Sequence, residues 1–325
     1  IADLDYFFAF RPQELQIGVD AAGSIYVAWL DWNNAVTVAD NAQGAWRVTV
    51  VASLDEYQQL YDVRLAVAGD GSVYVAYEMQ NELRLAAGFD GEWTIETIAD
   101  GYCSAGAFDV GVNLFGDPRL LYICFGDGTL RATQWTAAGW RTDQTKLPFA
   151  GDKIALADAY NGIAGVGGRD SRDGLVVVQL TNGEWSFESI ASETFGMYPQ
   201  IARLRHDYWF AVAAFDYAHD RTVLLEQRDD EEWESTTVSR ADNAGYEPTI
   251  ALASDGAVFV GHTAYPDGVP NARLATRPVD RWFHDRIDYD AQQGEGVAIA
   301  LDSAEQPQAV YWDANGDDLN WARRI

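Results

Sequence analysis

The chain has 325 residues, 48% of them hydrophobic and 13% aromatic, so it can bury a large core and is not a disordered protein. Its 50 acidic residues against 22 basic ones give a formal net charge of −28, which makes nucleic acid, anionic lipid and sulfated or uronic polysaccharides poor partners. No run of about 18 apolar residues occurs, so we expect no membrane insertion.

The first elements in the chain are short alternating runs. The sequence begins at Ile1 with no charged-then-apolar leader, which fits a processed secreted protein or a shortened chain. The run ADLDYFFAF, residues 2–10, is followed by LQIGV from Leu15, IYVAWL from Ile25 and VTVAD from Val36. A tight-turn sequence, DAAGS, separates the second and third of these four runs. A turn then leads to GAWRVTVV, so we predict four strands, named a to d, after residue 10.

This group of strands recurs along the chain. The turn and Trp that start strand d are found at Trp46, Trp93, Trp140, Trp185, Trp233 and Trp282, with spacings of 47, 47, 45, 48 and 49 residues. A strand c run precedes each of these six Trp residues. A seventh copy of the run, LNWAR from Leu319, is the last one in the chain. Antiparallel strands repeated at this period are typical of β-propeller blades.

We therefore predict an all-β fold, a seven-bladed β-propeller of four-stranded antiparallel blades in a single domain, residues 1–325. The last repeat ends after strand c, whereas residues 2–10 have no Trp-led run of their own. Pairing these residues with the final strand c would close the ring and cover both sheet edges. We interpret the recurring Trp as packing between blades, and stacking on a sugar is the alternative.

Residues 69–98 carry a resemblance to a known family. The order of a GDG turn, VYVAY, a polar hairpin, LRLA, DGEW and TIETI resembles the blades of secreted bacterial propellers of the BNR or sialidase-like type. The resemblance covers essentially the whole chain and implies the propeller architecture. A sialidase is expected to have six blades, S-x-D-x-G-x-x-W boxes and an arginine triad. The c–d turns here read FDGEW, TNGEW and VDRW, and no arginine triad maps onto them, so sialidase activity is not implied.

We expect a ligand to meet the loop end of the blades, which carries the b–c and d–a connections, because these are the longer and more irregular loops. His219 and His262 fall there in consecutive repeats. An acid–base site could combine them with three neighbours: Asp216, Tyr246 and Glu247. The alternative for His262 is a place in the blade core, since it aligns with Trp29 and Tyr77.

Further ligand-binding candidates lie in the same loops. Arg169 and Arg172, in RDSRDG, could grip a carboxylate, or could pair internally with neighbouring aspartates. Aromatic side chains that combine contact area with a polar group complete the predicted rim: Trp32, Tyr102, Tyr198, Tyr217 and Tyr265.

Metal and cofactor signals are sparse. DANGDD, residues 313–318, has the D-x-N-x-D form of a calcium loop, but Asn-Gly is also typical of a hairpin turn. We therefore expect no cofactor, and bound calcium is the alternative. No zinc spacing, phosphate loop or G-x-S-x-G elbow occurs. Cys103 and Cys124 are close enough in the chain to form a disulfide, which would support export, and the alternative is two unpaired cysteines in a reduced protein.

Three functions fit these observations. The first is an extracytoplasmic recognition module, secreted or periplasmic and monomeric, that binds a glycan or peptide at the loop end. The second is a carbohydrate-active enzyme, a polysaccharide lyase or glycoside hydrolase, that uses His219 and His262. The third is a scaffold that binds another protein.

Overall fold

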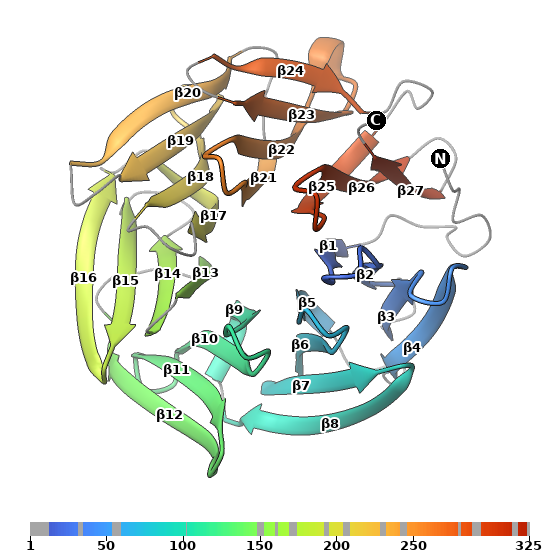
Figure 1. Ribbon diagram of the computed structural model, residues 1–325. Helices are drawn as coiled ribbons and strands as arrows, with labels where there is room; N and C mark the ends of the chain where they lie inside the picture. Colours follow the sequence, from blue (N-terminus) through green and yellow to red (C-terminus); the bar gives the residue numbers. More distant parts are fainter. Residues whose placement is uncertain are drawn as a thin grey trace. The chain divides into compact units, whose positions relative to one another are not determined.

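The computed structural model describes residues 13–31, 35–53, 60–101, 103–147, 153–159, 162–168, 174–191, 195–203, 209–227, 232–240, 246–278, 281–287, 294–313 and 318–323. Contacts divide the chain into two compact units, residues 8–148 and residues 1–7 with 149–325, and each is described by itself. Within the described ranges the regular elements are strands joined by turns, and the exception is one short 3-10 helix, η1 (Pro266–Gly268) (Figure 1).

The unit of residues 8–148 contains three sheets of four antiparallel strands, each in chain order from one side to the other. Blade 1 has β1 (Gln13–Val19), β2 (Ile25–Leu30), β3 (Ala35–Asp40) and β4 (Arg47–Ser53). Blade 2 has β5 (Leu60–Val67), β6 (Val73–Met79), β7 (Glu82–Phe89) and β8 (Glu92–Ala99). Blade 3 has β9 (Cys103–Val112), β10 (Pro118–Cys124), β11 (Thr129–Thr136) and β12 (Gly139–Lys146).

The other unit holds three more four-stranded antiparallel sheets and one sheet with three described strands. Blade 4 has β13 (Lys153–Ala159), β14 (Gly162–Gly168), β15 (Leu175–Thr181) and β16 (Glu184–Ala191), and blade 5 has β17 (Phe195–Arg203), β18 (Phe210–Asp216), β19 (Arg221–Gln227) and β20 (Glu234–Arg240). Blade 6 has β21 (Tyr246–Leu252), β22 (Val258–Ala264), β23 (Asn271–Arg277) and β24 (Phe283–Arg286). The described part of blade 7 has β25 (Gly294–Leu301), β26 (Pro307–Asp313) and β27 (Asp318–Arg323).

The protein is thus a seven-bladed β-propeller, and the fold predicted from the repeat is confirmed. The predicted strands coincide with the observed ones: IYVAWL is β2, and VYVAYE begins β6. The predicted closing strand, residues 2–10, lies outside the described residues. No helix in the described ranges has the length and hydrophobicity needed to cross a membrane.

The hydrophobic core lies between consecutive blades. Strand b of each blade is packed on both faces, and β2 and β22 are buried along their whole length. Clusters of buried side chains join blade 1 to blade 2, blade 2 to blade 3, blade 4 to blade 5, blade 5 to blade 6 and blade 6 to blade 7. A blade by itself would therefore expose much of the apolar surface that supports it.

Four of the six recurring Trp residues are found at these junctions, as predicted. Trp93, Trp140, Trp233 and Trp282 are partly buried, and each packs against the cluster that its blade shares with the preceding blade. Trp93 also faces Gly88 across the β7–β8 pair, and no larger residue fits beneath the indole.

Replacing Gly88 with alanine should therefore destabilise blade 2. An added Cβ would lie 2.6 Å from the Trp93 ring, so the indole would have to shift, at a cost of about 1–2 kcal/mol. Urea denaturation should show a lower midpoint for Gly88→Ala. Gly69→Ala is the matched control, because its Cβ would meet only Ala21, at 3.7 Å. Equal midpoints for the two variants would contradict this account of the Trp93 packing.

Candidate functional site

A cavity of about 250 Å³ lies between blades 2 and 3, within the unit of residues 8–148. Blade 2 supplies Tyr74, Leu85, Ala87, Thr94 and Glu96, and blade 3 supplies Asp117, Pro118, Trp135 and Trp140. Tyr74 and Pro118 lie in the first two positions of strand b of their blades, and Trp135 and Trp140 flank the β11–β12 turn. The cavity therefore lies toward the turn end of the blades, which carries the a–b and c–d turns, and away from the loop end that the sequence favoured.

Two indoles form one wall of this cavity. Trp135 and Trp140 are opposite each other in the β11–β12 pair, and their ring centroids are 5.1 Å apart with an angle of 76° between the planes. Trp140 is partly buried against the blade 2–3 core, whereas Trp135 keeps 41% of its surface exposed. An indole fixed by its neighbours at an open cavity is a flat apolar platform that loses little entropy when a ligand packs on it.

Carboxylates lie beside the indoles. The Trp140 Nε1–H donates to Glu96 Oε2 at 2.7 Å, which connects β12 of blade 3 to β8 of blade 2. Asp117 accepts a hydrogen bond from the Asn113 side chain at 3.0 Å. Burial, together with the charges of Asp70 and Asp117, raises the pKa of Tyr74, so its hydroxyl stays protonated and can donate. The cavity thus combines an apolar wall with hydrogen-bond acceptors and the hydroxyls of Tyr74 and Thr94.

The Trp pair distinguishes this junction from the preceding one. In blade 2 the residue opposite the recurring Trp93 is Gly88, and in blade 3 the corresponding residue is Trp135. The sequence signal was therefore a second Trp five residues before the recurring one, in WTAAGW. Sequence reasoning treated the recurring Trp residues alike and did not single out Trp135, Glu96 or Asp117.

His219 and Asp216 are together at the loop end of blade 5. Asp216 ends β18 and is fully buried, and it accepts from Arg221 Nε at 2.8 Å. His219 Nδ1 lies 2.9 Å from the same carboxylate oxygen, and the His219 side chain is 62% exposed. Tyr217, in the same turn, is 68% exposed.

His262 has different surroundings. It is completely buried within β22, and burial lowers its pKa to about 4, helped by the charges of His284 and Arg273 and opposed by the backbone of Val260. His262 faces Arg273 across the β22–β23 pair, as Tyr77 faces Arg84 in blade 2. The position of His262 therefore matches that of a core aromatic residue. The charged neighbours of His262, His284 and Arg273, belong to blade 6, whereas His219 bonds to Asp216 of blade 5.

The remaining predicted residues are dispersed or undescribed. Lys153 Nζ lies 5.6 Å from the centre of the Tyr198 ring, Glu247 is exposed, and Tyr265 is partly buried beside η1. Tyr198 and Glu247 both have positive φ angles, 52° and 56°, at bulges in β17 and β21. Five predicted positions lie outside the described side chains: Trp32, Tyr102, Arg169, Arg172 and Tyr246.

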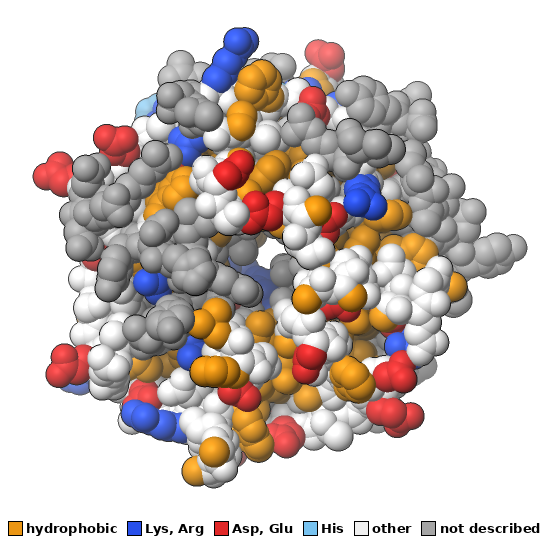
Figure 2. Space-filling model, viewed as in Figure 1, with side chains coloured by type: hydrophobic (Ala, Val, Ile, Leu, Met, Phe, Trp, Pro, Cys, Tyr) orange, Lys and Arg blue, Asp and Glu red, His pale blue; other side chains and the backbone are white. Residues whose placement is uncertain are grey.

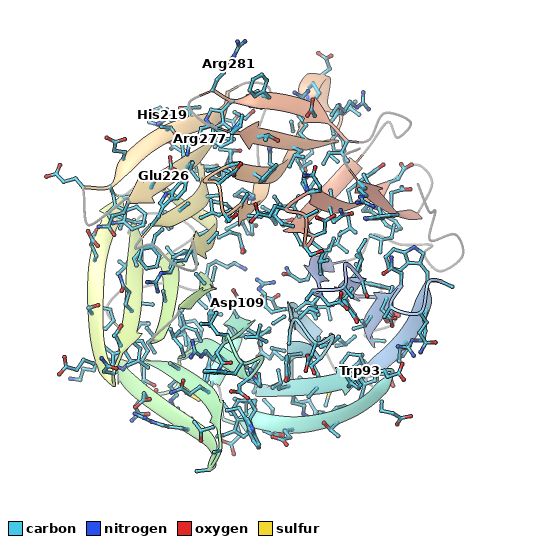
Figure 3. The ribbon with its side chains drawn as sticks, in the orientation of Figure 1. Trp93, Asp109, His219, Glu226, Arg277 and Arg281 are labelled. Carbon is cyan, nitrogen blue, oxygen red and sulfur yellow. A yellow bond between two sulfur atoms is a disulfide. The ribbon has the colours of Figure 1, made fainter. Side chains whose placement is uncertain are left out.

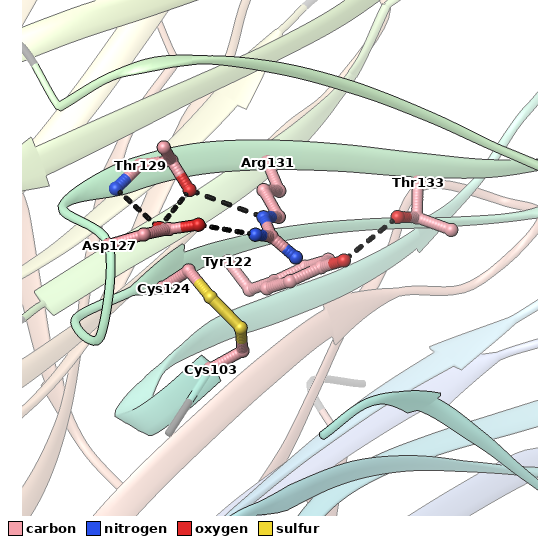
Figure 4. The surroundings of a disulfide bond; sticks show 7 residues. All are labelled: Cys103, Tyr122, Cys124, Asp127, Thr129, Arg131 and Thr133. Atoms are coloured by element: carbon pink, nitrogen blue, oxygen red, sulfur yellow. Dashed lines mark hydrogen bonds and ion pairs between the residues drawn. A yellow bond between two sulfur atoms is a disulfide. The ribbon is translucent and has the colours of Figure 1, made fainter. Parts of the chain in front are cut away.

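A disulfide joins Cys103 of β9 to Cys124 of β10, at the loop end of blade 3 (Figure 4). Beside it, Asp127 accepts hydrogen bonds from Thr129 and Arg131, and these bonds lower the pKa of the Asp127 carboxyl. The disulfide and this turn fasten the start of strand a to strands b and c.

No group of three or more His, Cys, Asp or Glu side chains is placed to hold a metal ion among the residues that the structure describes. Residues 314–317 of the predicted calcium loop lie outside these residues.

Comparison with known proteins supports the fold. No protein-family model matches the sequence, and no curated protein matches it. Among solved structures, the chain is similar to the SapL1 lectin in complex with alpha methyl fucoside, with 11% identity, a TM-score of 0.59 and coverage of 86% of this chain and 96% of that chain.

Two further structures with a similar fold have other activities. Hydrazine synthase of Kuenenia stuttgartiensis is 10% identical, with a TM-score of 0.65 and coverage of 100% of this chain and 99% of that chain. The Hadza microbial sialidase Hz136 is 10% identical, with a TM-score of 0.56 and coverage of 96% and 65%. The resemblance to sialidase-like propellers therefore holds for the architecture. Because a lectin, a hydrazine synthase and a sialidase share this fold, the function must be argued from the site.

Proposed function

We propose that the protein is a recognition module that binds a neutral glycan in the cavity between blades 2 and 3. The observation that carries the proposal is the combination of Trp135, Trp140 and Glu96 around one cavity of about 250 Å³. The proposal places binding at the turn end, whereas the sequence favoured the loop end.

The cavity has the chemistry that a sugar ring needs. The apolar C–H face of a pyranose packs on an indole, and its hydroxyls donate to carboxylates such as Glu96 and Asp117. The same carboxylates, on a chain with a net charge of −28, repel sialic, uronic and sulfated sugars. This charge argument favours neutral sugars over the acidic ones.

Other observations agree with this function. A lectin that binds alpha methyl fucoside and a sialidase share the architecture, which supports carbohydrate recognition on this fold without naming the sugar. The complete burial of His262 supports a role in blade packing over one in acid–base catalysis. The disulfide between Cys103 and Cys124 supports an extracytoplasmic location, and we retain a single domain and a monomer as part of the proposal.

Changing the cavity should weaken binding without unfolding the protein. We expect Trp135→Ala to lower affinity for a bound glycan at least about 30-fold, because a central Trp typically contributes 2 kcal/mol or more. Glu96→Gln should lower it about 10-fold, because an amide is a weaker acceptor for sugar hydroxyls than a carboxylate. A neutral-glycan array followed by calorimetric titration measures both effects.

The matched control for Trp135→Ala is Phe187→Ala. Phe187 lies on the outer strand β16 and is also 41% exposed, but it does not line the cavity. The control protein should bind like the wild type. A blank array with folded wild-type protein, or equal losses for the two alanine variants, would contradict the proposed function.

A further inference from the structure

A row of side chains on β7 continues from the cavity to the protein surface. Residues two apart in a strand share a face, so Leu85, Ala87 and Phe89 lie in line. Leu85 and Ala87 line the cavity, and Leu85 is only 3% exposed. Phe89, at the end of β7, is 61% exposed. The apolar wall of the cavity therefore extends outward onto an exposed phenylalanine.

Blade 3 places hydrophobic residues beside the cavity as well. Leu114 and Phe115 lie in the a–b turn that ends on Asp117, a cavity residue, and they are 40% and 90% exposed. The turn is held in shape by Asn113, whose Oδ1 accepts from the backbone N–H of Phe115 at 2.8 Å and of Asp117 at 2.9 Å. Phe115 is thus presented to solvent by an ordered turn.

Phe89 follows the cavity residues Leu85 and Ala87 on β7, and Leu114 and Phe115 come before the cavity residue Asp117 in its turn; these three exposed residues are called the hydrophobic rim. Hydrophobic side chains are exposed among acidic ones over the strands of blades 2 and 3, in the lower part of Figure 2. Single exposed hydrophobic residues are ordinary, but several beside one cavity, rimmed by polar groups, are typical of a binding surface. The cavity of about 250 Å³ is smaller than the 300–1,000 Å³ common for sites that enclose a larger ligand.

We propose that the cavity takes the terminal residue of an oligosaccharide and that the adjoining residue packs on the hydrophobic rim. The inference rests on the proposed function and specifies its ligand: a neutral glycan of at least two residues, bound by its end. The cavity is below the volume range of sites that enclose a larger ligand, so we expect the rest of the glycan to continue outside it. Phe89 and Phe115 supply the aromatic faces on which it can lie.

The test compares each monosaccharide with a matched disaccharide. Methyl glycosides of fucose, galactose, mannose and glucose are titrated beside disaccharides that carry the same sugar at the non-reducing end. For the sugar that binds, the wild type should favour the disaccharide about 10-fold. Phe89→Ser and Phe115→Ser should reduce this preference to within about 2-fold while leaving methyl glycoside affinity unchanged, and Trp135→Ala should lose both ligands.

The possible outcomes distinguish the rim inference from the proposed function. Equal wild-type affinities for glycoside and disaccharide would overturn the rim inference and leave glycan binding in the cavity intact. An undiminished disaccharide preference in both serine variants would overturn it too. Absence of binding by every sugar would overturn the proposed function together with the inference. If sedimentation shows that the wild type self-associates and the serine variants do not, the rim contacts a second copy of the chain, which also overturns it.

Discussion

Replacing Arg277 with methionine should lower the free energy of unfolding by about 3–5 kcal/mol. Arg277 ends β23 of blade 6 and donates to Glu226 on β19 of blade 5, and the two side chains are each only 8% exposed (Figure 3). The guanidinium also lies 5.2 Å from the centre of the Trp282 ring. Removing it would take this guanidinium away from the Glu226 carboxylate, which is buried between two blades, and weakening the pairing of a buried charge is costly in a protein interior.

Two controls separate this cause from a general loss of side-chain volume. The double variant Glu226→Leu with Arg277→Met should recover most of the stability, because it removes the buried charge together with its partner. Arg141→Met breaks the Arg141–Asp143 pair of 3.0 Å on β12, where Arg141 is 58% exposed, and should cost less than about 1 kcal/mol. Urea denaturation followed by tryptophan fluorescence compares the three proteins. A double variant no more stable than Arg277→Met would contradict the explanation.

Lowering the pH from 7 to 4 should destabilise the protein by about 3 kcal/mol through His262 alone. The ordinary pKa of histidine is 6.5 and that of buried His262 is about 4, so below pH 6.5 the unfolded chain binds a proton that the folded chain refuses. A difference of about 2.5 pKa units corresponds to about 3 kcal/mol. The contribution is absent above pH 6.5 and complete near pH 4.

The variant His262→Tyr isolates this contribution from the titration of carboxylates. Tyrosine occupies the corresponding place in blade 2, where Tyr77 faces Arg84, so the blade should accept it. The difference in unfolding free energy between wild type and variant should shift by about 3 kcal/mol toward the variant between pH 7 and pH 4. Parallel stability profiles for the two proteins would show that His262 is solvated or already charged in the folded state.

The fold could be predicted because its evidence is repeated along the chain. The spacing of Trp46 to Trp282 fixed the length of a blade, and the alternation in runs such as VYVAY fixed the strands. The junction packing of Trp93 and Trp140 also follows from the sequence, since a large apolar residue repeated once per blade needs an apolar neighbour, and an adjacent blade supplies it.

The candidate site could not be predicted in the same way. The general rule that function lies in irregular loops directed attention to His219 and the b–c loops, whereas the cavity is lined largely by regular strands. Glu96 and Trp135 are 39 residues apart in sequence and belong to different blades. Only the way blades 2 and 3 pack brings them together, and that packing depends on the size of side chains such as Leu85 and Pro118, which no repeat pattern encodes.

The two indoles beside the cavity also give the protein a spectroscopic signal that reports on this site. The electronic transitions of two indoles are close in energy. Because the ring centroids are 5.1 Å apart and the ring planes are 76° apart, the excited states of Trp135 and Trp140 are coupled. Such coupling contributes a paired band to the circular dichroism spectrum, and its size depends on the mutual orientation of the rings. Subtracting the spectrum of Trp135→Ala isolates that band from the signal of the other tryptophans. Occupancy of the cavity can then be followed in solution with no added chromophore.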